Sequence, residues 1–197
     1  RYNVKVDNVV LGSGSEGIMS CIMRTFLDTE DEVVSVHGTF VGFTVMARAR
    51  STAPILKPLK DYHFDLQLLA DSITERTKIV YLCNPNNPTG TFFEKSEFDA
   101  FLERLPKRVL VILDEAYFEF AKDIGNFPNS MDYRHDQVIT LRTFSKAYGL
   151  AGLRIGYGIA HEYLIKNLMK VKLPFEPSSA AQAAGLAALG DEEFLQK

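Results

Sequence analysis

Residues 108–117 read RVLVILDEAY, a run of apolar residues that ends in two carboxylates. A short run that is apolar on both faces is typical of a central strand in a sheet that helices cover on both sides. Asp114 comes directly after the run, and a carboxylate there is costly to bury unless it meets a cation. The stretch therefore predicts a buried strand with a polar site at its end, although Asp114 could also be a plain strand-end cap.

Short apolar runs alternate with helical patterns on both sides of this stretch. We expect strands at residues 9–11, 33–36, 53–57, 78–82, 108–113, 138–141 and 155–159, and helices at 18–26, 41–48, 65–72, 94–105 and 162–171. Strands that alternate with helices favour an α/β domain with a mostly parallel sheet. In such sheets ligands bind beyond the carboxyl ends of the strands, so the residues that follow each run are the candidates for function.

The composition is that of an ordinary globular domain. The 197 residues are 46% hydrophobic and 24% charged, with a net charge of −3, so nothing favours a nucleic-acid partner or an acidic membrane surface. The two cysteines, Cys21 and Cys83, and the four scattered histidines form neither a disulfide framework nor a metal-binding spacing. We expect a reducing, cytoplasmic setting, no metal, no signal peptide and no membrane span.

Residues 12–17, GSGSEG, match the pattern G-x-G-x-x-G between a predicted strand and a predicted helix. In a dinucleotide-binding fold the next strand should end in an acidic residue, but His37 follows residues 33–36, which makes this interpretation the weakest one. A helix N-terminus next to glycines still offers free amides to an anion. We therefore predict a phosphate site at Gly14 and Ser15, with a plain helix-capping turn as the alternative.

Two further strand ends carry polar motifs. Residues 83–90, CNPNNPTG, form a turn rich in proline and asparagine that presents amide side chains. Residues 142–146, RTFSK, place Lys146 beside the hydroxyls of Thr143 and Ser145. A lysine that forms Schiff bases must spend time uncharged, which desolvation or a nearby cation favours. A lone lysine in a loop is more often a solvated charge, so this motif depends on its neighbours.

Asp114 and Arg154 suit the two ends of one cofactor. A protonated pyridine nitrogen would be the cation that the Asp114 carboxylate lacks, and such a ring stabilises a substrate carbanion. Arg154 lies eight positions after Lys146, and arginine is the fork-shaped partner of phosphate oxygens. Together the strand-end motifs point to pyridoxal 5′-phosphate.

These features resemble the fold-type I pyridoxal phosphate (PLP) enzymes, specifically the aspartate aminotransferase superfamily. The resemblance rests on Asn-Pro-Thr-Gly at 87–90, Asp114 with Tyr117 three residues later, Ser145-Lys146 and Arg154, and it covers nearly the whole chain. Within the superfamily, residues 84–90, 114–117 and 142–156 are most similar to histidinol-phosphate aminotransferases. The resemblance implies the three-layer large domain of that superfamily, with a mostly parallel, mixed sheet flanked by helices.

The resemblance also implies a role for each matched residue. Lys146 would form the Schiff base with the cofactor and move the proton between substrate and cofactor, and Asp114 would pair with the pyridine nitrogen. Asn87 and Tyr117 would hydrogen-bond the phenolic oxygen. The phosphate would be held by Gly14, Ser15, Thr143, Ser145 and Arg154. Phe40 falls where an aromatic ring stacks on the cofactor, although a core phenylalanine looks the same from sequence.

The implied activity is transfer of an amino group between an amino donor such as histidinol phosphate and a 2-oxo acid such as 2-oxoglutarate, in a homodimer. A PLP-dependent decarboxylase or lyase, and the PLP-binding domain of a regulator, remain alternatives because Lys146 and Asp114 serve any of these. No residue matches the arginine that binds the substrate carboxylate in this superfamily. We therefore expect residues 1–197 to be a large-domain fragment that lacks the N-terminal segment and the small C-terminal domain.

Overall fold

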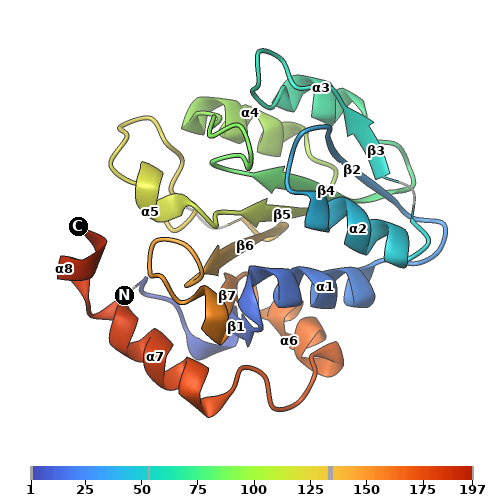
Figure 1. The fold of residues 1–197 in the computed structure, drawn as a ribbon. Coiled ribbons are helices and arrows are strands. Elements are labelled where there is room, and N and C mark those ends of the chain that lie inside the picture. Colours follow the sequence, from blue (N-terminus) through green and yellow to red (C-terminus); the bar gives the residue numbers. More distant parts are fainter. Residues whose placement is uncertain (1, 53, 133–134, 197) are drawn as a thin grey trace.

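The computed structural model describes residues 2–52, 54–132 and 135–196, and these residues build one sheet of seven strands (Figure 1). The strand order is β1-β7-β6-β5-β4-β2-β3. The strands span Val9–Gly12 (β1), Glu32–Val36 (β2), Pro54–Lys57 (β3), Thr77–Cys83 (β4), Leu110–Asp114 (β5), Val138–Thr143 (β6) and Gly156–Ile159 (β7). Strands β2 to β6 run parallel, whereas β7 is antiparallel to both of its neighbours, β6 and β1. The predicted mostly parallel, mixed sheet is confirmed.

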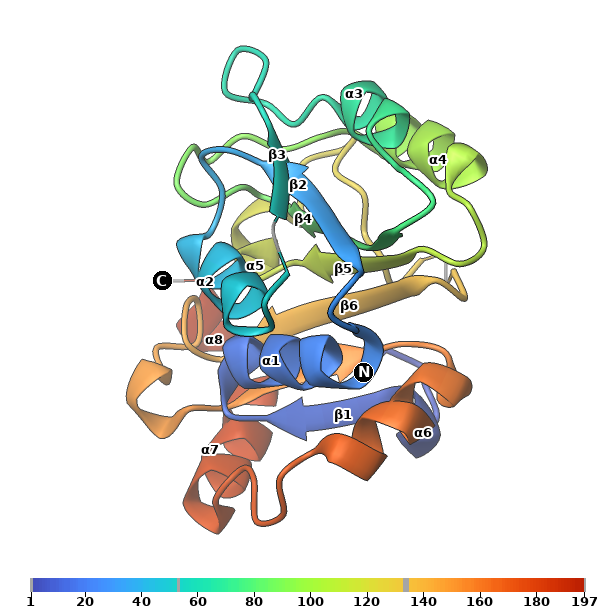
Figure 2. The ribbon, with the colours of Figure 1, turned by 90° about the vertical axis from the view of Figure 1, so that its right-hand side faces the viewer.

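Helices cover both faces of the sheet. They span Gly14–Phe26 (α1), Val41–Ala49 (α2), Leu66–Asp71 (α3), Lys95–Arg104 (α4), Phe118–Ala121 (α5), Glu162–Val171 (α6), Ser179–Leu189 (α7) and Glu192–Leu195 (α8), with 3-10 turns at Val6–Asn8 and Ala151–Leu153. Helices α1 and α2 lie side by side over one face, and α6 packs beside α1 (Figures 1 and 2). Among the described helices, none has the length and apolar character needed to cross a lipid bilayer.

The alternation of side chains along β7 shows the three layers directly. A Cβ atom on Gly158 would meet Ile18 of α1, so Gly158 faces that helix. Tyr157 and Ile159 point to the opposite face, where they pack with Ala181 of α7. The sheet therefore lies between the α1 layer and the α7 layer, as the three-layer prediction requires.

The central strands are buried because both of their faces are covered. Strands β5 and β6 are buried along their whole length, and Ile79 to Leu82 of β4 are fully inaccessible. Strand β5 begins at Leu110 rather than Arg108, since the amide of Val109 donates to Pro106 in a preceding turn. The predicted helix at 18–26 begins earlier, at Gly14, and the predicted strand at 53–57 is observed from Pro54, with Ala53 outside the described residues.

The dinucleotide interpretation of residues 12–17 is wrong. Strand β1, which precedes this motif, lies at the edge of the sheet and pairs only antiparallel with β7 among the described strands. The dinucleotide motif requires a parallel strand inside a β-α-β unit, with its crossover back to a neighbouring strand. The helix N-terminus at Gly14 is present and remains a candidate anion site.

Candidate active site

Several strand ends meet at one edge of the sheet. Strands β4 and β5 are parallel neighbours in which Cys83 pairs with Asp114, so both strands end side by side. Strand β6 ends beside them at Thr143. Because β7 is antiparallel, its first residue, Gly156, pairs with both Thr143 and Gly12, the last residue of β1. The N-terminus of α1 and the loop between β6 and β7 therefore arrive at the same edge.

A cavity of about 210 Å³ lies at this edge, and all of the predicted site residues line it. Its lining comprises Gly14, Ser15, Glu16, Phe40, Cys83, Asn87, Asp114, Ala116, Tyr117, Thr143, Ser145, Lys146 and Arg154. The residues come from the ends of β2, β4, β5 and β6, from the start of α1 and from the turn before β7. The structure thus brings together every residue that the sequence motifs singled out, while leaving Glu16, Cys83 and Ala116 as additions.

One end of the cavity is built for an anion. Helix α1 begins at Gly14, and Ser13 at its cap position makes no side-chain hydrogen bond to the helix, so the first amides are not capped from within. Gly14 has φ +75°, and a Cβ there would lie 2.8 Å from the Arg154 guanidinium. A Cβ on Gly156 would lie 2.5 Å from the amide nitrogen of Ser15. Both glycines are therefore required for this close approach.

Hydroxyl groups and a guanidinium complete this end. Thr143 Oγ1 lies 3.0 Å from Ser145 Oγ, which in turn accepts a hydrogen bond of 3.4 Å from Arg154 Nη1. Arg154 has φ +52°, in the left-handed region that a side chain makes unfavourable. Its guanidinium is exposed, lies 3.8 Å from Glu16 and donates to the carbonyl of Ala151. It is therefore held near the cavity by a long ion pair and a backbone hydrogen bond.

The cavity lining also includes the buried carboxylate of Asp114, which is 4% exposed. Its Oδ2 accepts a hydrogen bond of 2.9 Å from the Tyr81 hydroxyl, and its Oδ1 accepts one of 3.2 Å from the amide of Ala116. Burial raises the pKa of Asp114 to about 6, and these two hydrogen bonds oppose the rise. A cation arriving in the cavity would stabilise the ionised carboxylate.

Lys146 lines the same cavity. Its Nζ is 5.3 Å from the centre of the Tyr117 ring, and Asn87 lines the same cavity. The Lys146 side chain is exposed. Phe40 is half-buried, and its ring occupies the space where a Cβ on Gly42 would stand, 2.4 Å from Phe40 Cε1. Phe40 therefore belongs to the cavity wall.

Sequence reasoning missed a buried ion pair behind the cavity. Glu115 follows Asp114, and Arg142 precedes Thr143; the Arg142 Nη2 lies 2.8 Å from Glu115 Oε2, and both side chains are 1% exposed. The guanidinium also stacks on the Phe118 ring, 3.4 Å from its centre. Burial acts to lower the pKa of Arg142, but the charge of Glu115, together with its hydrogen bond and the nearby Tyr157 and Tyr2, outweighs burial, so the pKa is raised. The pair therefore ties together the strand ends that carry two halves of the cavity.

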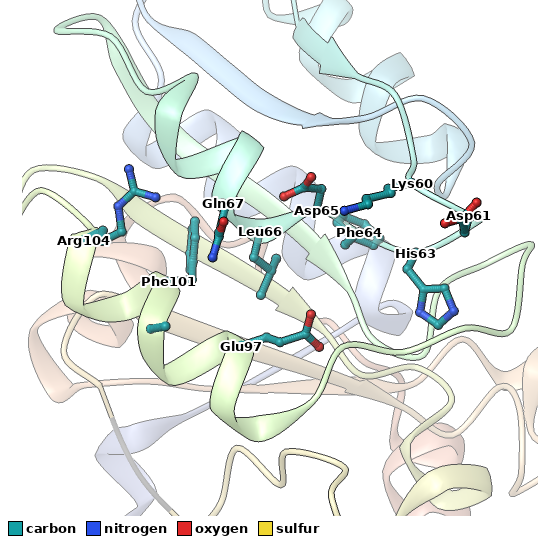
Figure 3. Close-up of a pocket in the computed structure, with 11 residues that line it drawn as sticks. Lys60, Asp61, His63, Phe64, Asp65, Leu66, Gln67, Glu97, Phe101 and Arg104 are labelled. Carbon is teal, nitrogen blue, oxygen red and sulfur yellow. The ribbon is translucent and has the colours of Figure 1, made fainter.

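A larger hollow lies elsewhere, between α4 and the segment that leads into α3 (Figure 3). Several of its polar groups are already used in local structure. Asp65 caps α3 by accepting from Leu68, Glu97 forms the capping box of α4, and Arg104 pairs with Asp71. Among the described residues, no group of three or more His, Cys, Asp and Glu side chains is placed to hold a metal ion. The cavity at the strand ends is the better candidate for chemistry.

The residues present fit pyridoxal phosphate. The glycine-flanked helix N-terminus with its hydroxyls and Arg154 suits a phosphate group, and the buried Asp114 suits a protonated ring nitrogen. Lys146 supplies an amine in the same cavity. The anion site, the amine and the carboxylate thus match the phosphate, the aldehyde and the ring nitrogen of this one molecule.

Comparisons with known proteins agree with this arrangement. The chain is 42% identical over 199 residues to histidinol-phosphate aminotransferase 2 of Carboxydothermus hydrogenoformans, and the match covers 100% of this chain and 55% of that protein. It is 41% identical over 199 residues to an aromatic amino acid aminotransferase of Corynebacterium glutamicum (strain R), with coverage of 100% and 58%. The chain thus spans about half the length of the curated relatives it matches.

A solved structure and a protein family give the same assignment. The crystal structure of histidinol-phosphate aminotransferase from Sinorhizobium meliloti in complex with pyridoxal-5′-phosphate superposes with a TM-score of 0.91 and 33% identity, over 96% of this chain and 52% of that one. The family described as "Aminotransferase class I and II" matches residues 1–197, the whole chain. The chain belongs to the class I and II aminotransferase family.

Proposed function

We propose that residues 1–197 are the PLP-binding large domain of an aminotransferase, whose N-terminal segment and small domain lie outside these residues. The carrying observation is that an uncapped helix N-terminus, an exposed lysine and a buried carboxylate line one cavity at the strand ends. This proposal is supported by the coverage, because the chain matches only about half of each relative and the rest of the relative is unmatched.

The roles of the side chains follow from their places in the cavity. When bound, pyridoxal phosphate supplies a protonated ring that withdraws electrons from the bonds to the substrate's α-carbon. Gly14, Ser15 and Arg154 hold the phosphate through amides, a hydroxyl and a guanidinium. Asp114 keeps the ring nitrogen protonated by placing a negative charge beside it. Each of these groups orients the reacting centre rather than reacting itself.

Lys146 carries out the proton transfer. Its Nζ is close to the Tyr117 ring, on a flexible stem at the mouth of the cavity. An amine there would hold the cofactor covalently and would serve as the group that moves a proton at the substrate's α-carbon. Tyr117 and Asn87 would hydrogen-bond the cofactor's phenolic oxygen, and Phe40 would cover its ring.

We propose histidinol phosphate as the amino donor and a 2-oxo acid such as 2-oxoglutarate as the acceptor, because histidinol-phosphate aminotransferases recur among the relatives at about 40% identity. The aromatic amino acid aminotransferase at 41% identity makes aromatic amino acids the second candidate. We also propose that the complete protein is a cytoplasmic homodimer. The residues that bind the substrate carboxylate would then lie outside residues 1–197.

The cofactor assignment is tested on the chain itself. Pyridoxal phosphate is added, the visible absorbance is recorded, and borohydride reduction is followed by peptide mapping. We expect a reduced adduct on Lys146 that is lost in Lys146→Ala and kept in Lys122→Ala, a control at an exposed lysine away from the cavity. A folded chain that gives no adduct, or an adduct that persists in Lys146→Ala, would contradict the proposal.

The substrate assignment is tested on the complete protein. Purified enzyme is given histidinol phosphate, phenylalanine or tyrosine with 2-oxoglutarate, and glutamate formation is followed. Preference for histidinol phosphate supports the first candidate, and preference for the aromatic amino acids supports the second. Release of carbon dioxide without glutamate would instead assign the protein to decarboxylation.

A further inference from the structure

Tyr81 reaches the cavity's carboxylate from inside the sheet. It is fully inaccessible, on β4. Cys83, two residues later on the same strand, pairs with Asp114 of β5, so Tyr81 and Cys83 share the face that Asp114 occupies. The Tyr81 hydroxyl donates to Asp114 Oδ2 at 2.9 Å. This is a contact between a core residue and a residue that lines the candidate active site.

The ring of Tyr81 cannot leave this position easily. It stacks on Phe43 of α2 with ring centres 4.4 Å apart and an angle of 11° between the planes, and Phe43 is also fully inaccessible. A tilt that released the hydroxyl would have to disrupt this packed pair. The ring of Tyr81 therefore packs against Phe43, while its hydroxyl forms a separate hydrogen bond with Asp114.

The groups around Asp114 leave Tyr81 as its main side-chain donor. The other titratable groups that act on it are Cys83 on β4, Glu115 directly after β5 and Lys146 in the cavity lining. The Cys83 thiol donates to the carbonyl of Pro85, and Glu115 is paired with Arg142. Burial, followed by the charge of Asp114, raises the pKa of Tyr81 well above its usual value, so the hydroxyl keeps its proton.

We propose that Tyr81 is a positioning residue that fixes the orientation and favours the charged form of Asp114, so that the carboxylate is presented to the ring nitrogen of the cofactor. The inference rests on the proposed function for its consequence, but the contact itself lies wholly within this chain. A hydrogen bond to one carboxylate oxygen restricts rotation of the group and stabilises its ionised form. Asp114 would otherwise be a buried carboxyl that holds its proton to higher pH.

The first test is the pKa of Asp114 in the cofactor-free chain, measured by carbon-13 NMR of labelled aspartate carboxyls and assigned with Asp114→Asn. In Tyr81→Phe, which keeps the stacked ring and removes only the hydroxyl, we expect this pKa to rise by roughly one to two units, because a hydrogen bond to a charged group is lost. The control is Tyr157→Phe, which removes a buried hydroxyl on β7 that contacts Tyr2 instead. An unchanged pKa in Tyr81→Phe overturns the proposal.

A second variant changes the donor without removing it. Replacing Tyr81 with 3-fluorotyrosine makes the hydroxyl a stronger donor in nearly the same volume, so the pKa of Asp114 should move down. A residue that only filled space would produce no such reversal of sign. This measurement also stands if Tyr81→Phe folds poorly, and a pKa that fails to fall would count against the proposal.

The third readout links the contact to the cofactor. Pyridoxal phosphate titrated into Tyr81→Phe should bind several-fold more weakly than into the original chain, and the pH at which the bound absorbance changes should shift, while Tyr157→Phe matches the original. Equal binding and an equal pH profile would overturn the positioning role. Failure of the original chain to bind, with the pKa shifts present, would count against the proposed function and leave the role of Tyr81 on Asp114 supported.

Discussion

The buried ion pair of Glu115 and Arg142 allows one prediction to be worked through from the coordinates. Arg142 donates from Nε to Glu115 Oε2 at 2.9 Å, with Nη2 at 2.8 Å from the same oxygen. Ser130 Oγ also donates to that oxygen at 2.8 Å, and Arg142 Nη1 donates to the Tyr2 hydroxyl at 3.0 Å. Both charged groups have therefore exchanged water for protein partners.

In Arg142→Met, Glu115 stays buried without its cation. Removing one partner of a buried pair costs about 3–5 kcal/mol, a large share of the ~5–15 kcal/mol that stabilises a typical domain. The double variant Arg142→Met with Glu115→Leu removes both charges and should be more stable than Arg142→Met alone. The exposed pair of Lys95 and Asp99 provides the control, because Lys95→Met should cost no more than about 0.5 kcal/mol.

The loss should also depend on pH with a definite sign. Burial raises the pKa of Glu115, and Arg142 opposes that rise, so Arg142→Met raises it further. When folding raises the pKa of a carboxyl, that group's contribution to the free energy of unfolding is largest below its unfolded pKa, about 4.3. This contribution is lost as the pH rises through the folded-state pKa. The deficit of Arg142→Met should therefore shrink as the pH is lowered towards ~4.

The assay is urea unfolding, followed by circular dichroism, between pH 4 and 8. It compares the original chain with Arg142→Met, Lys95→Met and the double variant. A loss of less than about 1 kcal/mol in Arg142→Met at pH 7 would contradict this prediction, since no buried charge would then have been left unpaired. The prediction would also be contradicted if the deficit stayed constant over the whole pH range.

Three further predictions concern the cavity. Burial raises the pKa of Asp114 to about 6, above its unfolded value, so the free energy of unfolding of the cofactor-free chain should fall by about 3 kcal/mol as the pH rises from ~4 through ~6. Urea unfolding of Asp114→Asn should show no such fall. The same pH dependence in both proteins would contradict this prediction. In Gly42→Ala the new methyl group displaces the Phe40 ring. Binding of pyridoxal phosphate, measured by titration, should weaken by roughly 0.5–1.5 kcal/mol, while the circular dichroism spectrum stays unchanged. Equal affinity would show that Phe40 does not cover the cofactor. Arg154→Gln should weaken binding of pyridoxal phosphate much more than binding of pyridoxal, and an equal loss for both would place the phosphate elsewhere.

Much of the fold follows from local sequence patterns. The apolar run at residues 109–113 is buried because a strand covered on both faces has no polar side, and the polar residues that follow it can only lie at the edge of the sheet. Gly14 and Gly156 are needed where the backbone of α1 meets β7, and glycine is the residue type that marks such an approach. These signals depend on neighbours in the chain, which is why the position of the site at the strand ends could be predicted, whereas Phe40, Asn87 and Tyr117 were named from the resemblance to the aminotransferase superfamily.

Other features depend on which segments become spatial neighbours. The antiparallel direction of β7 brings Arg154 back to the carboxyl ends of β5 and β6, and no local pattern states that direction. Tyr81 reads as one more apolar residue of a strand, and Arg142 as a solvated charge, until β4, β5 and β6 lie side by side.

The sequence by itself determined where the strands end and which side chains follow them, because hydrophobic periodicity and turn residues act over a few positions. Only the tertiary structure decided that the carboxylate of Asp114 is held by Tyr81, 33 positions earlier, and that the Glu115 carboxylate meets Arg142, 27 positions later. Strand pairing across such distances is set by the packing of the whole sheet, in which each buried polar group must find a partner.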